Sequence, residues 1–403
     1  MAGEIRMFST MTSSPPGAGL AHSSNTGTSG FVKHHIKLDG GKQITYEAFE
    51  GSMEKPLIDK REYKLIRLEN GLEALLIHDP EADKASAAMD VRVGHLSDPE
   101  GLYGMAHFCE HLLFMGTKKY PRENEYSEYL SNHSGSSNAF TSLENTNYFF
   151  DVGYAHFEGA LDRFAQFFLE PLFDPSCSER EIRAVDSEHK KNLQSDLWRS
   201  FQLDKSLSNP SHPYSKFGTG NLATLWEKPR EMGLDIRDEL LKFHERYYSA
   251  NMMKLVVLGR ESTAKLTEWV AEKFSNVPNK QCDVPSFPGS PLSDRELGTQ
   301  VLFRTIKDVR LLDITFPFPE QADLYRSKPG QLLSHLIGHE GHGSLFSCLK
   351  QRGWANLLSA GSAIHAKGFE LFKINIDLTH EGYEHYGDVV AAVFQYIDML
   401  RAK

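Results

Sequence analysis

The 403-residue sequence predicts an α+β fold built from more than one domain. Segments with strand periodicity and segments with helix periodicity both recur, but they do not alternate regularly as in a parallel β-α-β fold. Four prolines between Pro278 and Pro291 separate two such groups of segments. We therefore expect a first domain at 31–277, a linker at 278–298 and a second domain at 299–403.

The composition is typical of a globular protein, with 40% hydrophobic and 24% charged residues. No apolar run approaches the roughly 18 residues that a membrane span needs. The 44 basic and 54 acidic residues give a net charge of −10, which argues against a nucleic-acid partner, and without an apolar run we expect no membrane partner. Four scattered cysteines and the lack of a signal-peptide pattern favour a reducing compartment, and we expect a cytoplasmic location.

Residues 1–30 are expected to form a disordered tail. They contain six Ser, four Thr, five Gly and two Pro, which leaves too little apolar surface to offset the entropy of ordering. A mitochondrial location is the weaker alternative, because Arg6 and Glu4 do not make the Arg-rich, acid-poor pattern of a transit peptide.

Strands dominate the beginning of the first domain. Two apolar runs in Tyr63–His78 flank Asn70-Gly71, a dipeptide that favours a type I′ turn, so a hairpin is predicted here. Apolar residues alternate with other residues over 85–93, and this period-2 pattern predicts a strand. Strands are also predicted at 138–141 and 146–152.

Helices follow at 104–115 and at Phe157–Phe168, where apolar residues line one face and Pro171 ends the pattern. A long helix rich in Glu, Lys and Arg is predicted over 178–207. A strand at Met253–Leu258 and a helix at Ser262–Phe274 complete the first domain.

The second domain repeats these kinds of element over a shorter length. Strands are predicted at 311–316 and 369–378, and helical stretches at 329–351 and 383–400. This domain has about half as many residues as the first, so we expect it to be incomplete.

The sharpest motif is His107-Phe108-Cys109-Glu110-His111. On a helix the two histidines are four residues apart, so both imidazoles project from one face, and Glu110 lies on the adjoining edge. This H-x-x-E-H order is that of the inverzincins, in which imidazoles bind Zn²⁺ and the carboxylate takes a proton from water. Two ordinary helix histidines beside a surface glutamate are the alternative.

Glu188, 77 residues after His111, is the best candidate for a third ligand. Glu181 precedes it by two helical turns, so the two carboxylates share a face. The alternative for this pair is a solvated, charged helix surface. The residues alone leave both interpretations open.

Five strings in the chain are similar to the pitrilysin family of inverzincin zinc peptidases. They are GLYGMAHFCEHLLFMGTKKYP, GSSNAFTSLENTNYFF, EREIRAVDSEHKKNLQSDLWRSFQLDK, HPYSKFGTGN and HLIGHEGHGSLFSCLKQRGW. The resemblance covers nearly everything after residue 35 and matches the N-terminal half of these enzymes. It implies two related α/β-sandwich domains of the pitrilysin and processing-peptidase type, each an antiparallel-rich sheet with helices packed on it, with the second domain truncated.

The resemblance also implies roles for individual residues. His107, His111 and Glu188 would ligate one Zn²⁺ per chain, Glu110 would be the catalytic general base, and Glu181 would be a supporting carboxylate. The implied function is a zinc-dependent endopeptidase that hydrolyses short to medium peptides. A truncated peptide-binding or regulatory fragment is the alternative, and a noncatalytic subunit is a weaker one because the metal motif is complete.

Substrate binding is expected at two places. Asn138, Ala139, Phe140 and Thr141 match the edge strand on which the family pairs an extended substrate, and such backbone pairing accepts almost any sequence. Without the resemblance, Phe140 could equally be a core aromatic. His335, Gly338, Glu340, Leu358 and Ala360 match an exosite that holds the substrate's N-terminus. Ala360 stands where the family usually has glycine.

Six further residues carry expectations of their own. His335, His339 and His342 could suggest a second metal site, but the glycines among them argue against a regular helix. Cys109 is expected to be a buried helix residue, with an alternative role as a point where oxidation disturbs the site. Trp198 and Phe201 are expected in the core, on the same long helix as Glu188.

An unpaired half of such an enzyme would expose apolar surface. We therefore expect the chain to bind a C-terminal half or to associate with itself.

Overall fold

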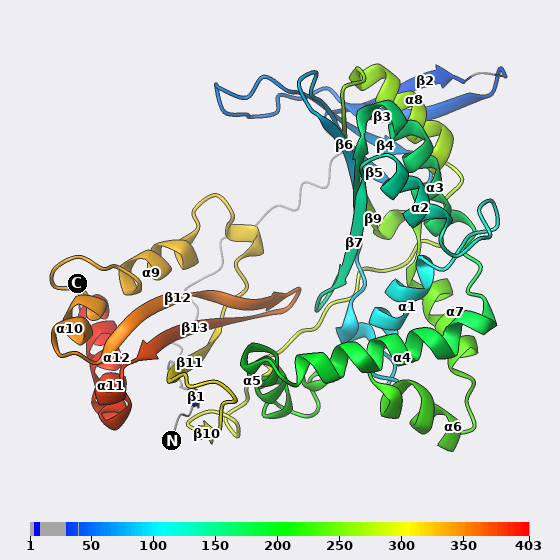
Figure 1. Cartoon of the computed structure of the whole chain (residues 1–403). Helices are drawn as coiled ribbons and strands as arrows, with labels where there is room; N and C mark the ends of the chain where they lie inside the picture. Colours follow the sequence, from blue (N-terminus) through cyan, green and yellow to red (C-terminus); the bar gives the residue numbers. More distant parts are fainter. Residues whose placement is uncertain (1–3, 9–29, 39, 403) are drawn as a thin grey trace. The chain divides into compact units, whose positions relative to one another are not determined.

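The computed structural model describes residues 4–8, 30–38 and 40–402. Contacts divide the chain into two units, shown in Figure 1. The large unit comprises the described residues of 21–189 and 217–285, and the small unit those of 1–20, 190–216 and 286–403. This division differs from the predicted boundaries, because residues 190–216 group with the small unit.

The large unit is built on an eight-stranded sheet with the order β2-β3-β4-β5-β9-β6-β8-β7. Its strands are β2 (Phe31–Lys37), β3 (Gln43–Phe49), β4 (Glu62–Leu68), β5 (Glu73–His78), β6 (Lys84–Val91), β7 (Ser136–Thr141), β8 (Thr146–Gly153) and β9 (Met253–Gly259). Only β5 and β9 pair in parallel among these neighbours. The antiparallel-rich sheet is therefore confirmed, and β7 lies at its edge.

The predicted hairpin forms, but its turn differs from the type I′ expectation. A type I′ turn needs a positive φ at both central residues. Gly71 has φ of 85°, but φ of Asn70 is not positive. Asn70 instead donates through Nδ2 to the carbonyls of Phe274 and Val277, at 2.9 and 3.0 Å. This tie to the end of a distant helix selects the turn geometry that the dipeptide alone could not reveal.

Seven helices of the large unit are α1 (Met105–Leu113), α2 (Glu125–Asn132), α3 (Phe157–Leu169), α4 (Pro175–Asn192), α6 (Lys228–Glu231), α7 (Ile236–Tyr247) and α8 (Thr263–Phe274). Figure 1 shows α1, α2, α3 and α7 on one side of the sheet. Their apolar faces and the alternating inward residues of the strands form one buried core, which includes Phe108, Tyr148 and Phe164. Because apolar residues recur with period 3.6 in helices and 2 in strands, both sets of residues reach this core.

The long helix predicted over 178–207 is two helices. The first is α4, and the second is α5 (Asp196–Ser206) in the small unit. The Asp196 carboxylate accepts from the backbone N–H groups of Ile306 and Lys307 at 2.8 and 2.9 Å. This anchor fixes the start of α5 on a distant loop, which explains a break that the helix-forming residues around it do not signal.

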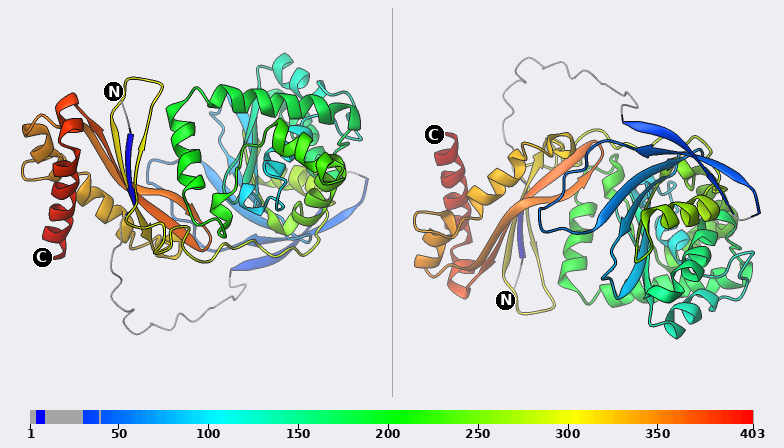
Figure 2. Two further views of the ribbon diagram at one scale, coloured as in Figure 1. Left: turned by 90° about the horizontal axis from the view of Figure 1, so that it is seen from below. Right: turned by 90° about the horizontal axis from the view of Figure 1, so that it is seen from above.

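The small unit contains a five-stranded sheet with the order β10-β1-β11-β13-β12. Its strands are β1 (Glu4–Phe8), β10 (Gln300–Phe303), β11 (Leu311–Phe318), β12 (Ala355–Ala366) and β13 (Phe369–Leu378), and its other helices are α9 (Pro329–Ile337), α10 (Leu345–Gln351), α11 (His380–Glu384) and α12 (Tyr386–Arg401). In both views of Figure 2, α12 (red) lies against the orange strands, where Val389 and Val393 join the core.

The predicted disordered tail is wrong for Glu4–Phe8. These residues form β1, which pairs antiparallel with β10 and parallel with β11. Residues 1–3 and 9–29, on which the rest of that prediction falls, lie outside the described residues. Among the helices that are described, none combines the length and the hydropathy that a membrane crossing requires.

Candidate metal centre

Helix α1 carries the H-x-x-E-H motif and starts at a fixed point. The Asp98 carboxylate, which is buried, accepts from the backbone N–H groups of Gly104 and Ala106 at 2.6 and 2.9 Å. A carboxylate at this place satisfies N–H groups that have no partner inside the helix and opposes the positive end of its dipole. The position of His107 and His111 along the helix is therefore set by a buried cap.

The two histidines of α1 converge with Glu188 of α4. The Glu188 Oε2 atom lies 3.7 Å from His107 Nε2 and 3.8 Å from His111 Nε2. One ligand atom from each of the three side chains lies within 4.8 Å of the others. Across the part of the chain that the structure describes, this is the one group of three or more His, Cys, Asp or Glu side chains that meets this spacing.

The second nitrogen of each imidazole is held by a different partner. His107 Nδ1 donates to the backbone carbonyl of Thr219 at 2.7 Å. His111 Nδ1 lies 3.3 Å from Glu181 Oε2. Both rings therefore turn Nε2 toward Glu188, as in metal sites where an outer hydrogen bond orients the ligating histidine.

The charges at this centre fit a divalent cation. The pKa of His111 is raised to about 9, because hydrogen bonds to the Glu181 and Glu188 carboxylates outweigh burial, which favours the neutral ring. The hydrogen bond to His111 is the main reason that the pKa of Glu181 is lowered. Two imidazoles and one carboxylate are the donor set of catalytic zinc sites that leave a fourth position open, so these residues fit Zn²⁺.

Glu110 lies beside this centre and is buried. Its side chain accepts a hydrogen bond from Thr141 Oγ1 to Oε2 at 2.5 Å. Burial raises the pKa of Glu110, since it disfavours the charged carboxylate. A carboxylate with a raised pKa holds a proton more readily than an exposed one, which suits a group that accepts and returns a proton.

The predicted substrate strand Asn138–Thr141 is the last four residues of β7, at the sheet edge. Exposed and half-buried residues alternate along β7, and Phe140 is 50% exposed. The alternative that Phe140 is a core aromatic is therefore wrong. Thr141, the last residue of the strand, is the residue that contacts Glu110, so the edge strand leads to the candidate base.

The predicted exosite residues lie in the small unit. His335 is exposed on α9, Gly338 caps that helix, and Glu340 is exposed after it. Ala360 is half-buried on β12, but Leu358 is only 5% exposed and belongs to the core of the unit. The structure therefore brings α9 and β12 together but does not present Leu358 at the surface.

The glycine-rich stretch after α9 is not helical, as predicted from its glycines, because α9 ends at Ile337 and α10 begins at Leu345. The rings of His335 and His339 lie edge to face with centroids 5.6 Å apart. Neither histidine belongs to the group of His107, His111 and Glu188 that could hold a metal ion.

Cys109 is buried, as expected, and burial raises the pKa of its thiol to about 12. The expectation for Trp198 is wrong, because it lies on α5 rather than on the helix of Glu188 and is 45% exposed. Phe201 is half-buried beside it, with ring centroids 6.2 Å apart.

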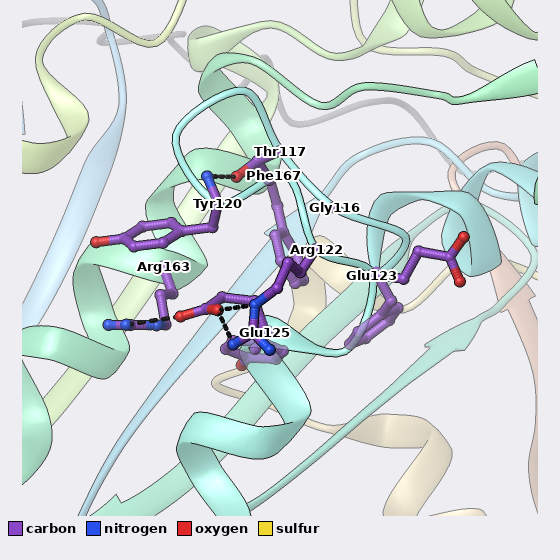
Figure 3. A pocket seen from close by; sticks show the side chains of 10 residues that line it. Gly116, Thr117, Tyr120, Arg122, Glu123, Glu125, Arg163 and Phe167 are labelled. Atoms are coloured by element: carbon purple, nitrogen blue, oxygen red, sulfur yellow. Dashed lines mark hydrogen bonds and ion pairs between the residues drawn. The ribbon is translucent and has the colours of Figure 1, made fainter.

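A separate small pocket lies where the chain leaves α1 and enters α2 (Figure 3). Glu125 pairs there with both Arg122 and Arg163, so the central charges are matched. The pocket wall also includes Glu123, which binds Arg180 at 2.8 Å. None of the predicted ligands or substrate residues lines this pocket, so it is distinct from the candidate metal centre.

Thr219, like Asp98, is a site residue that the sequence did not single out. It acts through its backbone carbonyl, which leaves no side-chain signature. The only available signal was the pair of glycines around it in HPYSKFGTGN, a string that carried the resemblance but had no role assigned.

Two family models match the chain. The model described as Insulinase (Peptidase family M16) matches residues 73–211, and the model described as Peptidase M16 inactive domain matches residues 235–403. The first match contains the ligands on α1 and α4 together with β7. The second contains β12, β13 and the helices of the small unit that follow residue 286.

Curated relatives and a solved structure agree with these matches. Human insulin-degrading enzyme is 57% identical over 86% of this chain and 34% of its own length. The A-factor-processing enzyme of Saccharomyces cerevisiae is 52% identical over 88% of this chain and 35% of its own length. The crystal structure of pitrilysin superposes with a TM-score of 0.82 at 35% identity, covering 89% of this chain and 38% of that chain. The chain thus spans about a third of the length of these relatives.

Proposed function

Since the chain belongs to the insulinase family of peptidases (family M16), we propose that its large unit is the zinc-binding part of a metalloendopeptidase. His107, His111 and Glu188 would hold one Zn²⁺. The convergence of these three side chains, with ligand atoms within 4.8 Å of one another, is the observation that carries the proposal.

Glu110 is proposed as the general base. When bound, Zn²⁺ supplies a Lewis acid that polarises a carbonyl and lowers the pKa of water. Thr141 occupies Oε2 of Glu110, so Oε1 would accept the proton from water and return it to the leaving amine. Burial supports this role because it raises the pKa of Glu110 above that of an exposed carboxylate.

The proposed substrates are short to medium peptides in extended conformation. The free edge of β7 would pair with the substrate backbone, and Phe140 would offer an exposed apolar contact. Because Thr141 joins this strand to Glu110, a peptide paired along β7 would be led to the base. The names of the relatives, an insulin-degrading and an A-factor-processing enzyme, favour peptide hormones and similar peptides as the substrate class.

We also propose that His335, Gly338, Glu340 and Ala360 contribute to a second contact with the peptide. His335 and Glu340 are exposed, and α9 packs on β12, which forms the edge of the small sheet. Leu358 is buried, so its role would be to support this surface from below.

A peptide-binding fragment with little turnover is the second candidate function. The match covers 34% of the length of human insulin-degrading enzyme, so peptide binding and turnover are separate proposals for this chain. The second candidate keeps the metal centre and the edge strand and binds peptides through them.

One assay separates the two candidates. The purified chain is analysed for zinc content and incubated with a quenched fluorogenic peptide, with and without a chelator. Turnover that the chelator abolishes supports the peptidase, and peptide binding without turnover supports the fragment. A folded chain that takes up no zinc contradicts both.

The Glu110→Gln variant tests the base. It removes the proton acceptor but keeps the size of the side chain, so turnover should fall by roughly 100-fold or more while zinc content stays at one per chain. If this variant hydrolysed the peptide at the parent's rate, Glu110 would not be the base.

A further inference from the structure

We propose that the loop 217–222 is a positioning element of the metal centre, in which the Thr219 carbonyl fixes the tautomer and direction of His107. A close contact between Gly104 and Gly220 makes this possible. The inference deepens the proposed function and rests on it, because it concerns how the chain prepares its own ligands for Zn²⁺.

The chemistry of the Thr219 contact determines which nitrogen of His107 carries hydrogen. A backbone carbonyl can only accept, so at 2.7 Å the His107 Nδ1 atom must be the donor. In the neutral ring the lone pair is then on Nε2, the atom that lies 3.7 Å from Glu188 Oε2. The loop thus leaves the metal-facing nitrogen free to act as a ligand before any ion arrives.

Two glycines allow the loop to approach the start of α1 closely. Gly104 and Gly220 have φ of 91° and 79°, a region that favours glycine. A Cβ on Gly104 would lie 2.2 Å from the Gly220 Cα. A Cβ on Gly220 would lie 2.8 Å from Leu225 Cδ1 and 3.0 Å from the Gly104 Cα. A Cβ on Gly104 must therefore push the loop away from α1. A Cβ on Gly220 displaces the end of the Leu225 side chain and presses on the Gly104 Cα, so it also widens the gap between the loop and α1, and the Thr219 carbonyl moves with the loop.

The same loop is also tied to the helix that carries the third ligand. The backbone N–H of Leu222 donates to Asp186 Oδ1 at 3.0 Å, and Asp186 precedes Glu188 by two residues on α4. The loop therefore contacts both helices that provide ligands, α1 through His107 and α4 through Asp186. Displacing it should disturb the spacing of the ligands as well as the orientation of one ring.

The Gly220→Ala variant tests the inference, with Gly233→Ala as a matched control. Gly233 also has a positive φ, 71°, but a Cβ there meets nothing within 4 Å. Both substitutions carry the same kind of backbone strain, and only the first displaces the loop. Zinc affinity is measured by competition with a chromophoric chelator on metal-free protein, and thermal unfolding of each metal-free protein is recorded alongside.

We expect Gly220→Ala to raise the zinc Kd by roughly 10- to 100-fold, the range typical of losing an outer partner of a ligand. Gly233→Ala should leave the Kd unchanged at a similar unfolding temperature. An unchanged Kd for folded Gly220→Ala overturns the inference while the proposed function stands. A parent chain that binds no zinc overturns the proposed function, and the positioning role with it.

A measurement on the parent chain covers the case in which Gly220→Ala does not fold. Histidine-selective ¹⁵N labelling of the metal-free protein reports which nitrogen of His107 is protonated, with His107→Gln identifying the signal. The Nδ1–H tautomer is expected. The Nε2–H tautomer would overturn the inference, because Thr219 would then not be bonded to the ring.

Discussion

At the scale of single residues, Thr141 is a link between the edge strand and the base. Its hydroxyl donates to Glu110 Oε2, and this hydrogen bond lowers the pKa of Glu110 against the larger effect of burial. Thr141 was expected from the resemblance to bind substrate. The structure adds a contact through which it can adjust the proton affinity of the base.

We predict that Thr141→Val moves the acidic limb of the activity profile to higher pH. Removing the hydrogen bond raises the pKa of Glu110, and a base works only above its pKa, so activity at acid pH is lost first. The measurement is kcat/KM against pH with a fluorogenic peptide, and Thr141→Ser, which keeps the hydroxyl, is the control. A valine variant whose profile superposes on the parent's would show that this contact does not act on the base.

His244 on α7 is a second residue whose environment has a testable effect, here on how stability depends on pH. Its ring stacks on Tyr248 and meets Phe173 edge to face, with centroids 4.6 and 4.9 Å away. Burial, aided by the nearby positive charge of Lys280, lowers the pKa of His244 from 6.5 to about 3. The folded chain therefore holds this ring neutral where the unfolded chain would protonate it.

This difference predicts how stability depends on pH. Between pH 6.5 and 3 the unfolded state binds one more proton than the folded state at His244, so the contribution is complete above pH 6.5 and is lost as the pH falls. From pH 7 to pH 5 the loss is up to about 2 kcal/mol. His244→Leu should reduce the pH dependence of unfolding by this amount, measured by urea titration of metal-free protein at both pH values. An equal dependence in parent and variant would contradict the prediction.

At the scale of elements, periodicity located most of the fold. The strands of the hairpin, β6 and β8 and the helices α1, α3 and α8 were predicted within a few residues, because each has one face in the core of the large unit. β12 was missed. Its pairing with β13 is interrupted by register shifts near Ala355 and Ser362, and its buried residues do not alternate, so the period-2 signal is lost.

Sequence patterns also could not predict the elements that depend on partners far away in the chain. β1 gains its hydrogen bonds from strands about 300 residues away in the chain, and its surrounding composition indicated disorder. The boundary between α4 and α5 is set by the contacts of Asp196 with a loop of the small unit. Lys373 of β13 forms a buried ion pair with Asp204 of α5, which further explains why residues 190–216 belong to that unit.

The ligands of the candidate metal centre could be predicted from the sequence, but the group that orients His107 could not. The spacing of His107 and His111 placed two imidazoles on one helix face, and the resemblance selected Glu188 from several glutamates on its helix. The Thr219 contact could not be predicted in the same way, because any residue can offer a backbone carbonyl. Its position follows from packing between two glycines that are 116 residues apart in sequence.

At the scale of the whole molecule, the small unit exposes several large apolar side chains on two neighbouring elements. Leu332 and Leu336 on α9 are 61% and 39% exposed, and Leu357 on β12 is 57% exposed. α9 packs on β12, so these side chains belong to neighbouring elements. Exposed apolar groups that gather in one region favour association.

We predict that the chain self-associates through this surface. Size-exclusion chromatography or sedimentation over a range of protein concentrations should show a mass that rises with concentration. Burying apolar area contributes about 25 cal/mol per Å² removed from water, so a charged side chain at the centre of the surface should weaken association strongly. Leu332→Glu together with Leu357→Glu should therefore shift the chain toward monomer.

Leu57→Glu is the control, because Leu57 is fully exposed in the large unit and lies outside this surface. A parent chain that stays monomeric at every concentration, or an equal shift with Leu57→Glu, would contradict the assignment of this surface to self-association.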